Sequence, residues 1–370
     1  MQGKRQKVIT GWQLFCLILN GVVGIGIFNL ARQVGEVAGR GVLLTIPLAG
    51  LLALGTLAGH YLLARRFPRQ TLAEYAEKIL SPPLGKIYLG LYGVLSLALA
   101  ITVSRSYWSL VSAWALGRTP QLAFLLPLIL VCWNVARRGV VVTARVVELI
   151  NYGTLTLMLL LMIPVIPVDL DYVRPVMETG VGGILRGIIP SLYATIGFDV
   201  FLIVFPYVRS RRPFAAGAAA IALITLFYTV TTLLIIGNLG LELVLINTWP
   251  LQTYLHRFAL AVFERADIVF LIAWVFQIIN TVIVLMFTGM TVLQGVVPQK
   301  VSRRWLHLSI LVLAMAGVAW PVKFASQVKL VNSLSPIAFF YHAITPLLLW
   351  LIAALRGLKG EKTDVQDQAA

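Results

Sequence analysis

Long apolar runs separated by short polar segments occupy this chain from residue 9 to residue 355. Because a membrane-spanning helix needs about 20 apolar residues, the runs predict ten spanning helices. The predicted spans are 9–31, 42–64, 87–116, 121–136, 141–166, 188–207, 214–239, 268–297, 306–322 and 333–355. The pattern therefore predicts an all-α integral membrane protein, a single polytopic domain over 1–370 with a polar tail at 356–370.

The first apolar run contains three glycines in six residues, Gly21, Gly24 and Gly26. A segment in lipid stays helical because its amides find no water there, unless broken backbone faces protein or a water-filled cavity. In transporters, unwound spans place free helix ends beside a ligand at the membrane midplane. Small residues also line tight helix contacts. The cluster alone therefore predicts either a break or close helix packing.

The sixth run is also interrupted, by Pro190 and Gly197, and it carries Asp199 near its middle. Five spans occupy 9–166 and five occupy 188–355, so the second half must be inverted relative to the first. This is the pattern of a 5+5 inverted repeat, in which spans one and six correspond. A carboxylate in a span costs roughly 2.5–3.5 kcal/mol. Asp199 is therefore expected to face a cavity or a partner; the alternative is a protonated or paired structural residue.

The charge distribution gives the orientation. The chain is 59% hydrophobic and 12% charged, with a net charge of +16. Of its 30 Lys and Arg, 20 fall on the side of the N-terminus in the predicted topology, which places both termini in the cytoplasm. Because these charges are dispersed in short loops, they argue against a nucleic-acid partner.

The reactive side chains give no sign of an enzyme. Cys16 and Cys132 lie in different spans, which predicts no disulfide framework. The four histidines are expected to be isolated from one another, with no metal-binding spacing. We therefore expect no catalytic residues, no metal and no cofactor.

Arg105 is a charged residue inside the third predicted span. It is expected to pair with Asp199, to face the carboxylate of a ligand, or to extend its stem to the interface. The residues alone leave these three interpretations open.

Two pairs of polar residues lie at helical spacing. Arg145 and Glu148 share a face at the start of the fifth span. They are expected to form a structural ion pair, or alternatively a proton or gating relay. Gln277 and Asn280 in the eighth span are expected either to line the cleft or to hydrogen-bond to a neighbouring helix.

Short motifs follow one another along the whole chain. They are Gly24-Ile25-Gly26-Ile27, Arg65-Arg66-Phe67-Pro68, Thr71-Leu72-Ala73-Glu74-Tyr75, Ala144-Arg145-Val146-Val147-Glu148, Val173-Arg174-Pro175-Val176, Ile196-Gly197-Phe198-Asp199, Trp249-Pro250 and Phe263-Glu264-Arg265-Ala266-Asp267. With these motifs in this order, the chain resembles the GerB family, the B subunits of spore nutrient-germinant receptors, in the amino acid/polyamine/organocation permease superfamily. Asp199 stands where many members carry Glu.

The resemblance implies a LeuT-like fold and a germinant-sensing role for a small nutrient, an L-amino acid above all. It also implies partnership with the A and C subunits of the receptor and residence in the spore inner membrane or the cell membrane. Two alternatives remain open. The first is a proton-coupled amino-acid transporter, and the second is a ligand-gated ion or water channel.

The predicted binding site lies between the two broken spans. The ligand carboxylate is expected to accept hydrogen bonds from the amides of Gly24, Ile25 and Gly26, where a free helix end favours negative charge. The predicted site also includes Val22, Tyr193, Ala194, Thr195, Gly197 and Asp199. Carbonyls near Val22, Tyr193 and Ala194 are expected to face the ammonium group. Arg105, Arg145, Glu148, Gln277 and Asn280 are the predicted coupling or gating residues.

Overall fold

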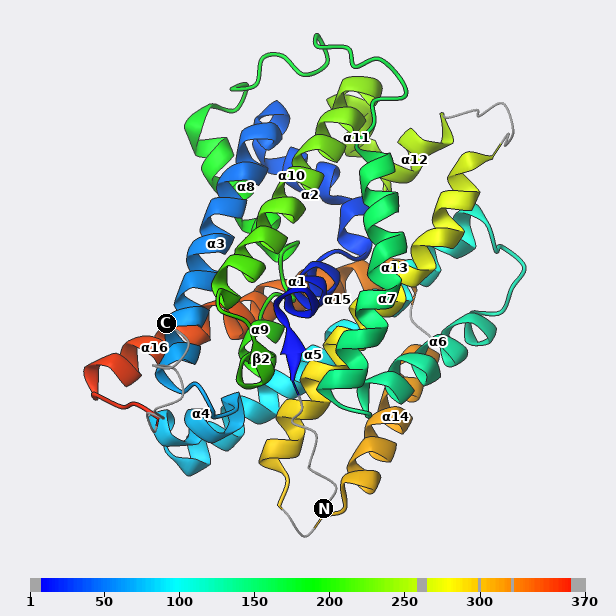
Figure 1. The fold of residues 1–370 in the computed structure, drawn as a ribbon. Coiled ribbons are helices and arrows are strands. Elements are labelled where there is room, and N and C mark those ends of the chain that lie inside the picture. The colour runs from blue at the N-terminus through cyan, green and yellow to red at the C-terminus, as the bar shows by residue number, and fades with distance from the viewer. Residues whose placement is uncertain (1–7, 258–264, 299–300, 321–322, 361–370) are drawn as a thin grey trace.

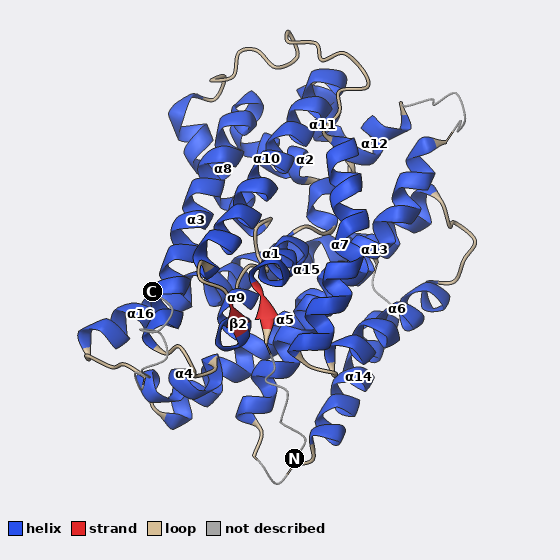
Figure 2. Ribbon diagram, viewed as in Figure 1, coloured by secondary structure: helices blue, strands red, loops and turns tan. Residues whose placement is uncertain are grey.

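The computed structural model describes residues 8–257, 265–298, 301–320 and 323–360, and these are almost entirely helical (Figure 2). In this part of the chain, six helical stretches are long and apolar enough to cross a membrane. They are Leu30–Arg66, Pro82–Trp114, Val140–Leu161, Pro213–Leu239, Asp267–Val296 and Phe324–Leu355. The coarse prediction of a helical membrane protein is confirmed.

The elements follow the predicted apolar runs (Figure 1). The first half contains α1 (Gly11–Val22), η1 (Ile25–Phe28), α2 (Leu30–Ala38), η2 (Gly39–Gly41), α3 (Val42–Arg66), α4 (Leu72–Leu80), α5 (Pro82–Trp114), α6 (Gln121–Ala136) and α7 (Val140–Leu161). The second half contains α8 (Gly180–Tyr193), α9 (Val200–Val204), η3 (Phe205–Tyr207), α10 (Pro213–Leu239), α11 (Leu241–Ile246), α12 (Pro250–His256), α13 (Ala266–Val296), α14 (Arg303–Ala319), α15 (Phe324–Phe339), the π-helix η4 (Phe340–Ile344) and α16 (Thr345–Leu355).

Local signals explain where several helices begin. Thr10 and Gln13 form a capping box at the start of α1, and Thr71 and Glu74 form another at α4. Each box satisfies two backbone amides that the first helical turn leaves unpaired. Pro82 opens α5, at a position where a helix needs no amide donor.

Helix α1 lies in the middle of the bundle, packed against α7, α10 and α13 (Figure 1). Helix α13 also packs along α5, α6 and α7. Because α1 is surrounded by helices rather than by lipid, the end of α1 at Val22 is buried within protein. This is the setting in which a membrane span tolerates broken backbone.

Two very short strands depart from the all-helical prediction. Strand β1 (Ile9–Thr10) pairs in parallel with β2 (Val208–Arg209), with Ile9 opposite Val208. The pair joins the start of the first broken segment to the end of the second. Each strand has only two residues, which is too short to give an alternating pattern in the sequence. Sequence reasoning therefore missed both strands.

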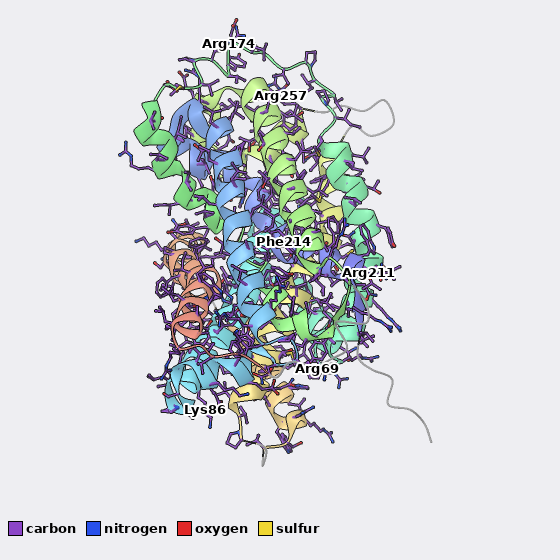
Figure 3. The ribbon with its side chains drawn as sticks, turned by 60° about the vertical axis from the view of Figure 1, so that its left-hand side comes forward. Arg69, Lys86, Arg174, Arg211, Phe214 and Arg257 are labelled. Atoms are coloured by element: carbon purple, nitrogen blue, oxygen red, sulfur yellow. The ribbon has the colours of Figure 1, made fainter. Side chains whose placement is uncertain are left out.

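Charged loop residues separate toward two ends of the molecule. Figure 3 shows Arg174 and Arg257 at one end and Arg69 and Lys86 at the other. The predicted topology assigns the first two to one side of the membrane and the last two to the opposite side. The order of crossings stays a prediction, because Arg211, assigned to the side of Arg69 and Lys86, lies between the two ends in Figure 3.

Candidate functional site

The first helix break falls at the predicted glycine cluster. Helix α1 ends at Val22, and the backbone resumes a helical turn at Ile25. The carbonyl of Val23 accepts hydrogen bonds from Thr281 Oγ1 at 2.7 Å and from Gln277 Nε2, and Trp274 Nε1 lies 3.4 Å from the Gly24 carbonyl. One face of α13 thus supplies donors to the carbonyls that the break frees.

The amides of the first break are in a different situation. Among the described residues, none accepts a hydrogen bond from the amide of Gly24, Ile25 or Gly26. A Cβ added at Gly26 would meet no heavy atom within 4 Å, whereas one at Gly24 would lie 3.3 Å from Thr281. Both Ile25 and Gly26 are partly accessible. The break therefore presents unpaired donors beside open space.

The second break crosses the first. Helix α8 ends at Tyr193 and α9 begins at Val200. Gly197 has a φ of +122°, and a Cβ there would collide with the carbonyl oxygen of Gly21. A Cβ on Gly21 would in turn lie 2.9 Å from the carbonyl oxygen of Gly197. Gly21 and Gly197 are therefore required because two backbones touch, and the predicted binding role of Gly197 gains no support from this geometry.

Asp199 lies at the end of the second break and is only 4% exposed. Its Oδ2 accepts a hydrogen bond from Tyr92 Oη at 2.5 Å and lies 2.7 Å from His342 Nδ1. A buried carboxylate is costly without such partners. The alternative of a paired aspartate thus describes Asp199 better than an acid that only faces a cavity.

The other predicted residues of the second break have mixed surroundings. The Ala194 carbonyl lies 3.4 Å from the donor Tyr228 Oη, and the hydroxyl of Thr195 donates to the carbonyl of Leu192 at 2.7 Å. The rings of Tyr193 and Phe339 lie 5.8 Å apart. Tyr193 and Ala194 stay partly accessible, as does Ile25 of the first break. Val22 is buried at the end of α1.

Arg105 has a partner that none of its three interpretations foresaw. Its Nη1 donates to the carbonyls of Gly317, Val318 and Trp320 at 3.1, 3.1 and 2.6 Å. These carbonyls lie at the C-terminal end of α14, where helical residues lack acceptor partners and a cation is favourable. Of the three interpretations, pairing with Asp199 is wrong: Arg105 caps a helix, and Asp199 pairs with His342.

The expected ion pair of Arg145 and Glu148 is also wrong. Glu148 accepts a hydrogen bond from Gln13 Nε2 at 2.8 Å, and Arg145 is exposed. The ion pairs of the described residues do not include this couple. Spacing placed both residues on one face, but Gln13 of α1 offers the carboxylate a nearer donor.

Both eighth-span residues are buried and hydrogen-bond to a neighbouring segment. Gln277 serves the first break, as described above. Asn280 Nδ2 donates to Asn20 Oδ1 at 2.9 Å, and Asn20 Nδ2 donates to Asn151 Oδ1 at 2.6 Å. This chain of amides joins α13, α1 and α7. Asn280 therefore has the interhelical role.

Sequence reasoning missed Tyr92, His342 and His60. The four histidines were expected to be isolated, yet His342 contacts Asp199, and His60 Nε2 lies 3.3 Å from the carbonyl of the adjacent Ala343. His60 and His342 both lie inside predicted spans. The rule that singled out Asp199, that an ionisable group in a span has a functional partner, applies equally to them.

Comparisons with known proteins agree with one another. A family model described as "Spore germination protein" matches residues 8–321. Among curated relatives, spore germination protein YndE of Bacillus subtilis (strain 168) is 25% identical over 361 residues, covering 96% of this chain and 98% of its own length. Spore germination protein KB of the same organism is 22% identical, covering 95% and 96% of the two chains.

Solved structures show the fold. The crystal structure of MhsT in complex with L-phenylalanine superposes with a TM-score of 0.66 at 13% identity, covering 94% of this chain and 89% of MhsT. Mhp1 is a nucleobase-cation-symport-1 family transporter solved in a closed conformation with bromovinylhydantoin bound. It superposes with a TM-score of 0.60 at 14% identity, covering 91% of this chain and 78% of Mhp1. Both are LeuT-fold transporters, and the chain shares their fold.

Proposed function

The chain belongs to the spore germination protein family, and from that premise we propose that it is the germinant-sensing membrane subunit of a spore germination receptor. The ligand is a small nutrient, an L-amino acid, held between the two helix breaks. The architecture proposed for this role is ten spans in a 5+5 inverted repeat, with both termini in the cytoplasm. The protein resides in the spore inner membrane and acts with A and C subunits.

The observation that carries the proposal is the open space at Gly26 beside unpaired amides. A Cβ at Gly26 would meet nothing within 4 Å, and the amides of Gly24, Ile25 and Gly26 have no acceptor among the described residues. Amides that have neither a protein acceptor nor water are costly. A ligand carboxylate seated there would satisfy them, and the charged acceptor would make the hydrogen bonds stronger than neutral ones.

The ligand class rests on this chemistry and on the related fold. The MhsT structure is described as a complex with L-phenylalanine and the Mhp1 structure as one with bromovinylhydantoin. Since one fold holds two such different ligands, the fold alone does not select the ligand. The unpaired amides favour a carboxylate, and the partly accessible Ile25, Tyr193 and Ala194 favour an apolar group on the same ligand.

Signalling requires a ligand that binds one conformation better than another. Moving a two-state equilibrium from 1:99 to 99:1 takes about 5.5 kcal/mol of differential binding. A single amino acid supplies this only if most of its polar groups are engaged. The crossing at Gly21 and Gly197 supports such a switch, because any movement of one break displaces the other.

The test places a cysteine in the open space. The variant Gly26→Cys should react with a water-soluble thiol reagent in the purified chain, since both native cysteines are 0% exposed. A panel of L-amino acids is then tested for protection, and the matching amino acid should slow the reaction at least tenfold. Gly182→Cys is the matched control: a Cβ there also meets nothing within 4 Å, but it lies exposed in the first turn of α8, outside the predicted spans. Protection of neither cysteine by any nutrient, or equal protection of both, would refute the site.

A proton-coupled permease is the second candidate, favoured by the buried contact of Asp199 with His342. An acid–imidazole pair in a span is a common proton carrier in transporters. Uptake of an amino acid that protects Gly26→Cys, driven by an imposed pH gradient in proteoliposomes, separates this role from sensing. A sensor binds the amino acid without accumulating it.

A further inference from the structure

Two buried imidazoles lie on either side of the second break. His60, on α3, is 0% exposed, and His342, in the π-helix η4, is 2% exposed. His342 Nδ1 contacts Asp199 Oδ2, and the His60 ring lies 5.2 Å from the ring of Phe198, the residue before Asp199. Elements far apart in sequence thus bring one imidazole into contact with Asp199 and a second beside the residues next to Asp199 and His342.

The hydrogen bonds fix which nitrogen of each ring carries a proton. A carbonyl only accepts, so His60 Nε2 donates to Ala343 at 3.3 Å; an ionised carboxylate also only accepts, so with Asp199 ionised His342 Nδ1 donates to it at 2.7 Å. The remaining nitrogens, His60 Nδ1 and His342 Nε2, are buried and have no hydrogen-bond partner among the described residues. Each neutral ring therefore keeps one basic nitrogen available for a proton.

The groups that face this cluster are phenols. Tyr92 of α5 donates to Asp199, and its ring lies 4.2 Å from that of His342. The centre of the Tyr88 ring lies 5.9 Å from that of Tyr92 and 6.1 Å from that of Tyr341 in η4. Phenols are neutral at physiological pH.

No ion pair within the described residues joins a lysine, arginine or glutamate to Asp199 or His342. The described residues also place no group of three or more His, Cys, Asp and Glu so as to hold a metal ion. The charge of the cluster is therefore set by its own protons.

Charge balance then determines the resting state. With both imidazoles neutral, the cluster carries the single negative charge of Asp199. One added proton makes it electroneutral, and a second makes it positive. Because an uncompensated charge buried away from water is strongly unfavourable, the electroneutral state is the one that the buried arrangement favours.

We propose that Asp199, His342 and His60 form a proton-binding site that holds one exchangeable proton and biases the conformation of the second break. Loss of that proton leaves the carboxylate charge buried and favours an arrangement in which Asp199 reaches water. Asp199 is two residues from Gly197, which touches Gly21. The proton therefore acts on the crossing of the two breaks. This inference deepens the second candidate function, for which it names the proton-binding groups, and it is tested without any germinant.

Histidine nuclear magnetic resonance tests the site. The chain has only four histidines, so ring-labelled histidine in the purified full chain in nanodiscs gives few signals. His342→Gln and His60→Gln assign the two buried rings. The signal of each imidazole is then followed from pH 5 to pH 9. His256→Gln is the matched control: His256 is exposed, so its replacement should leave the signals of the buried rings unchanged.

Two variants of the surroundings give opposite expected shifts. Asp199→Asn removes the negative charge, so the proton affinity of the cluster should fall at least tenfold. Tyr92→Phe removes a donor that stabilises the ionised carboxylate, so the cluster should hold its proton at least threefold more tightly. A merely structural network would give neither shift.

The outcome that overturns the proposal is equally plain. It is wrong if His342 titrates at the same pH in the unmodified chain and in Asp199→Asn. It is also wrong if neither buried ring changes protonation between pH 5 and 9. If Asp199→Asn does not fold, the shift in proton affinity in Tyr92→Phe decides instead, because that variant keeps the charges of the cluster intact.

Discussion

The two helix breaks are stabilised by different kinds of side chain. At the first, neutral side chains of α13 donate to the freed carbonyls, and glycine leaves open space beside unpaired amides. At the second, a buried carboxylate is held by a phenol and an imidazole. The first break is therefore suited to receive a ligand. The second is suited to hold or release a charge.

The two breaks also differ in which glycines are essential. Gly21 and Gly197 permit two backbones to touch, whereas Gly26 leaves space that no described atom fills. A cluster of glycines in a membrane span thus serves two purposes at once, close approach and an open wall. Substitutions at and around both breaks test this division.

Gly197→Ala should have the largest effect. Its backbone conformation alone costs about 1–3 kcal/mol for a residue with a side chain, and its Cβ would collide with the Gly21 carbonyl. We expect the folded protein to fail to accumulate in membranes. Gly26→Ala is the control and should accumulate normally. Equal accumulation of both would mean that the breaks do not cross as described.

Asp199→Ala should come next. It leaves the donors of Tyr92 and His342 buried without their acceptor. Removing one partner of a buried ion pair costs about 3–5 kcal/mol. The thermal unfolding midpoint of the purified chain should fall markedly, and less in Asp199→Asn, which keeps an acceptor oxygen. If Asp199→Ala unfolds at the same temperature as the unmodified chain, the second break does not depend on this charge.

Arg105→Gln tests a buried charge outside both breaks. Its three carbonyl acceptors at the end of α14 would lose a charged donor, and such hydrogen bonds contribute about 1.5–3 kcal/mol. We expect lower thermal stability with unchanged amino-acid protection of Gly26→Cys. Loss of protection without loss of stability would instead make Arg105 a ligand residue.

Thr281→Val should have the smallest effect. It removes one donor to the Val23 carbonyl, but Gln277 still donates there. A neutral hydrogen bond contributes about 1 kcal/mol, so the unfolding midpoint should fall slightly. Combining it with Gln277→Leu should cost more than the two single changes together, because only then is the carbonyl left unpaired. Simple additivity would mean that the two side chains do not share this acceptor.

Much of the site could be predicted from local sequence. Gly21, Gly24 and Gly26 marked the first break, and Gly197 and Asp199 marked the second, because lipid penalises both broken backbone and buried charge wherever they occur. Partners were harder to predict. Arg105 was left with three possible partners and its carbonyl acceptors were not among them, and Arg145 was expected to pair with Glu148, because spacing gives a residue's helix face but not the helix that packs against it.

Local sequence was enough to predict a helical membrane protein, to mark the two interrupted spans, and to show that Asp199 needs a cavity or a partner. Only the tertiary structure decided that the partner is His342, 143 residues away, and that Gly21 meets Gly197. Apolar length and glycine content act within one segment, so they can be read along the chain. The meeting of distant segments depends on the packing of all the helices together, and no single segment contains that information.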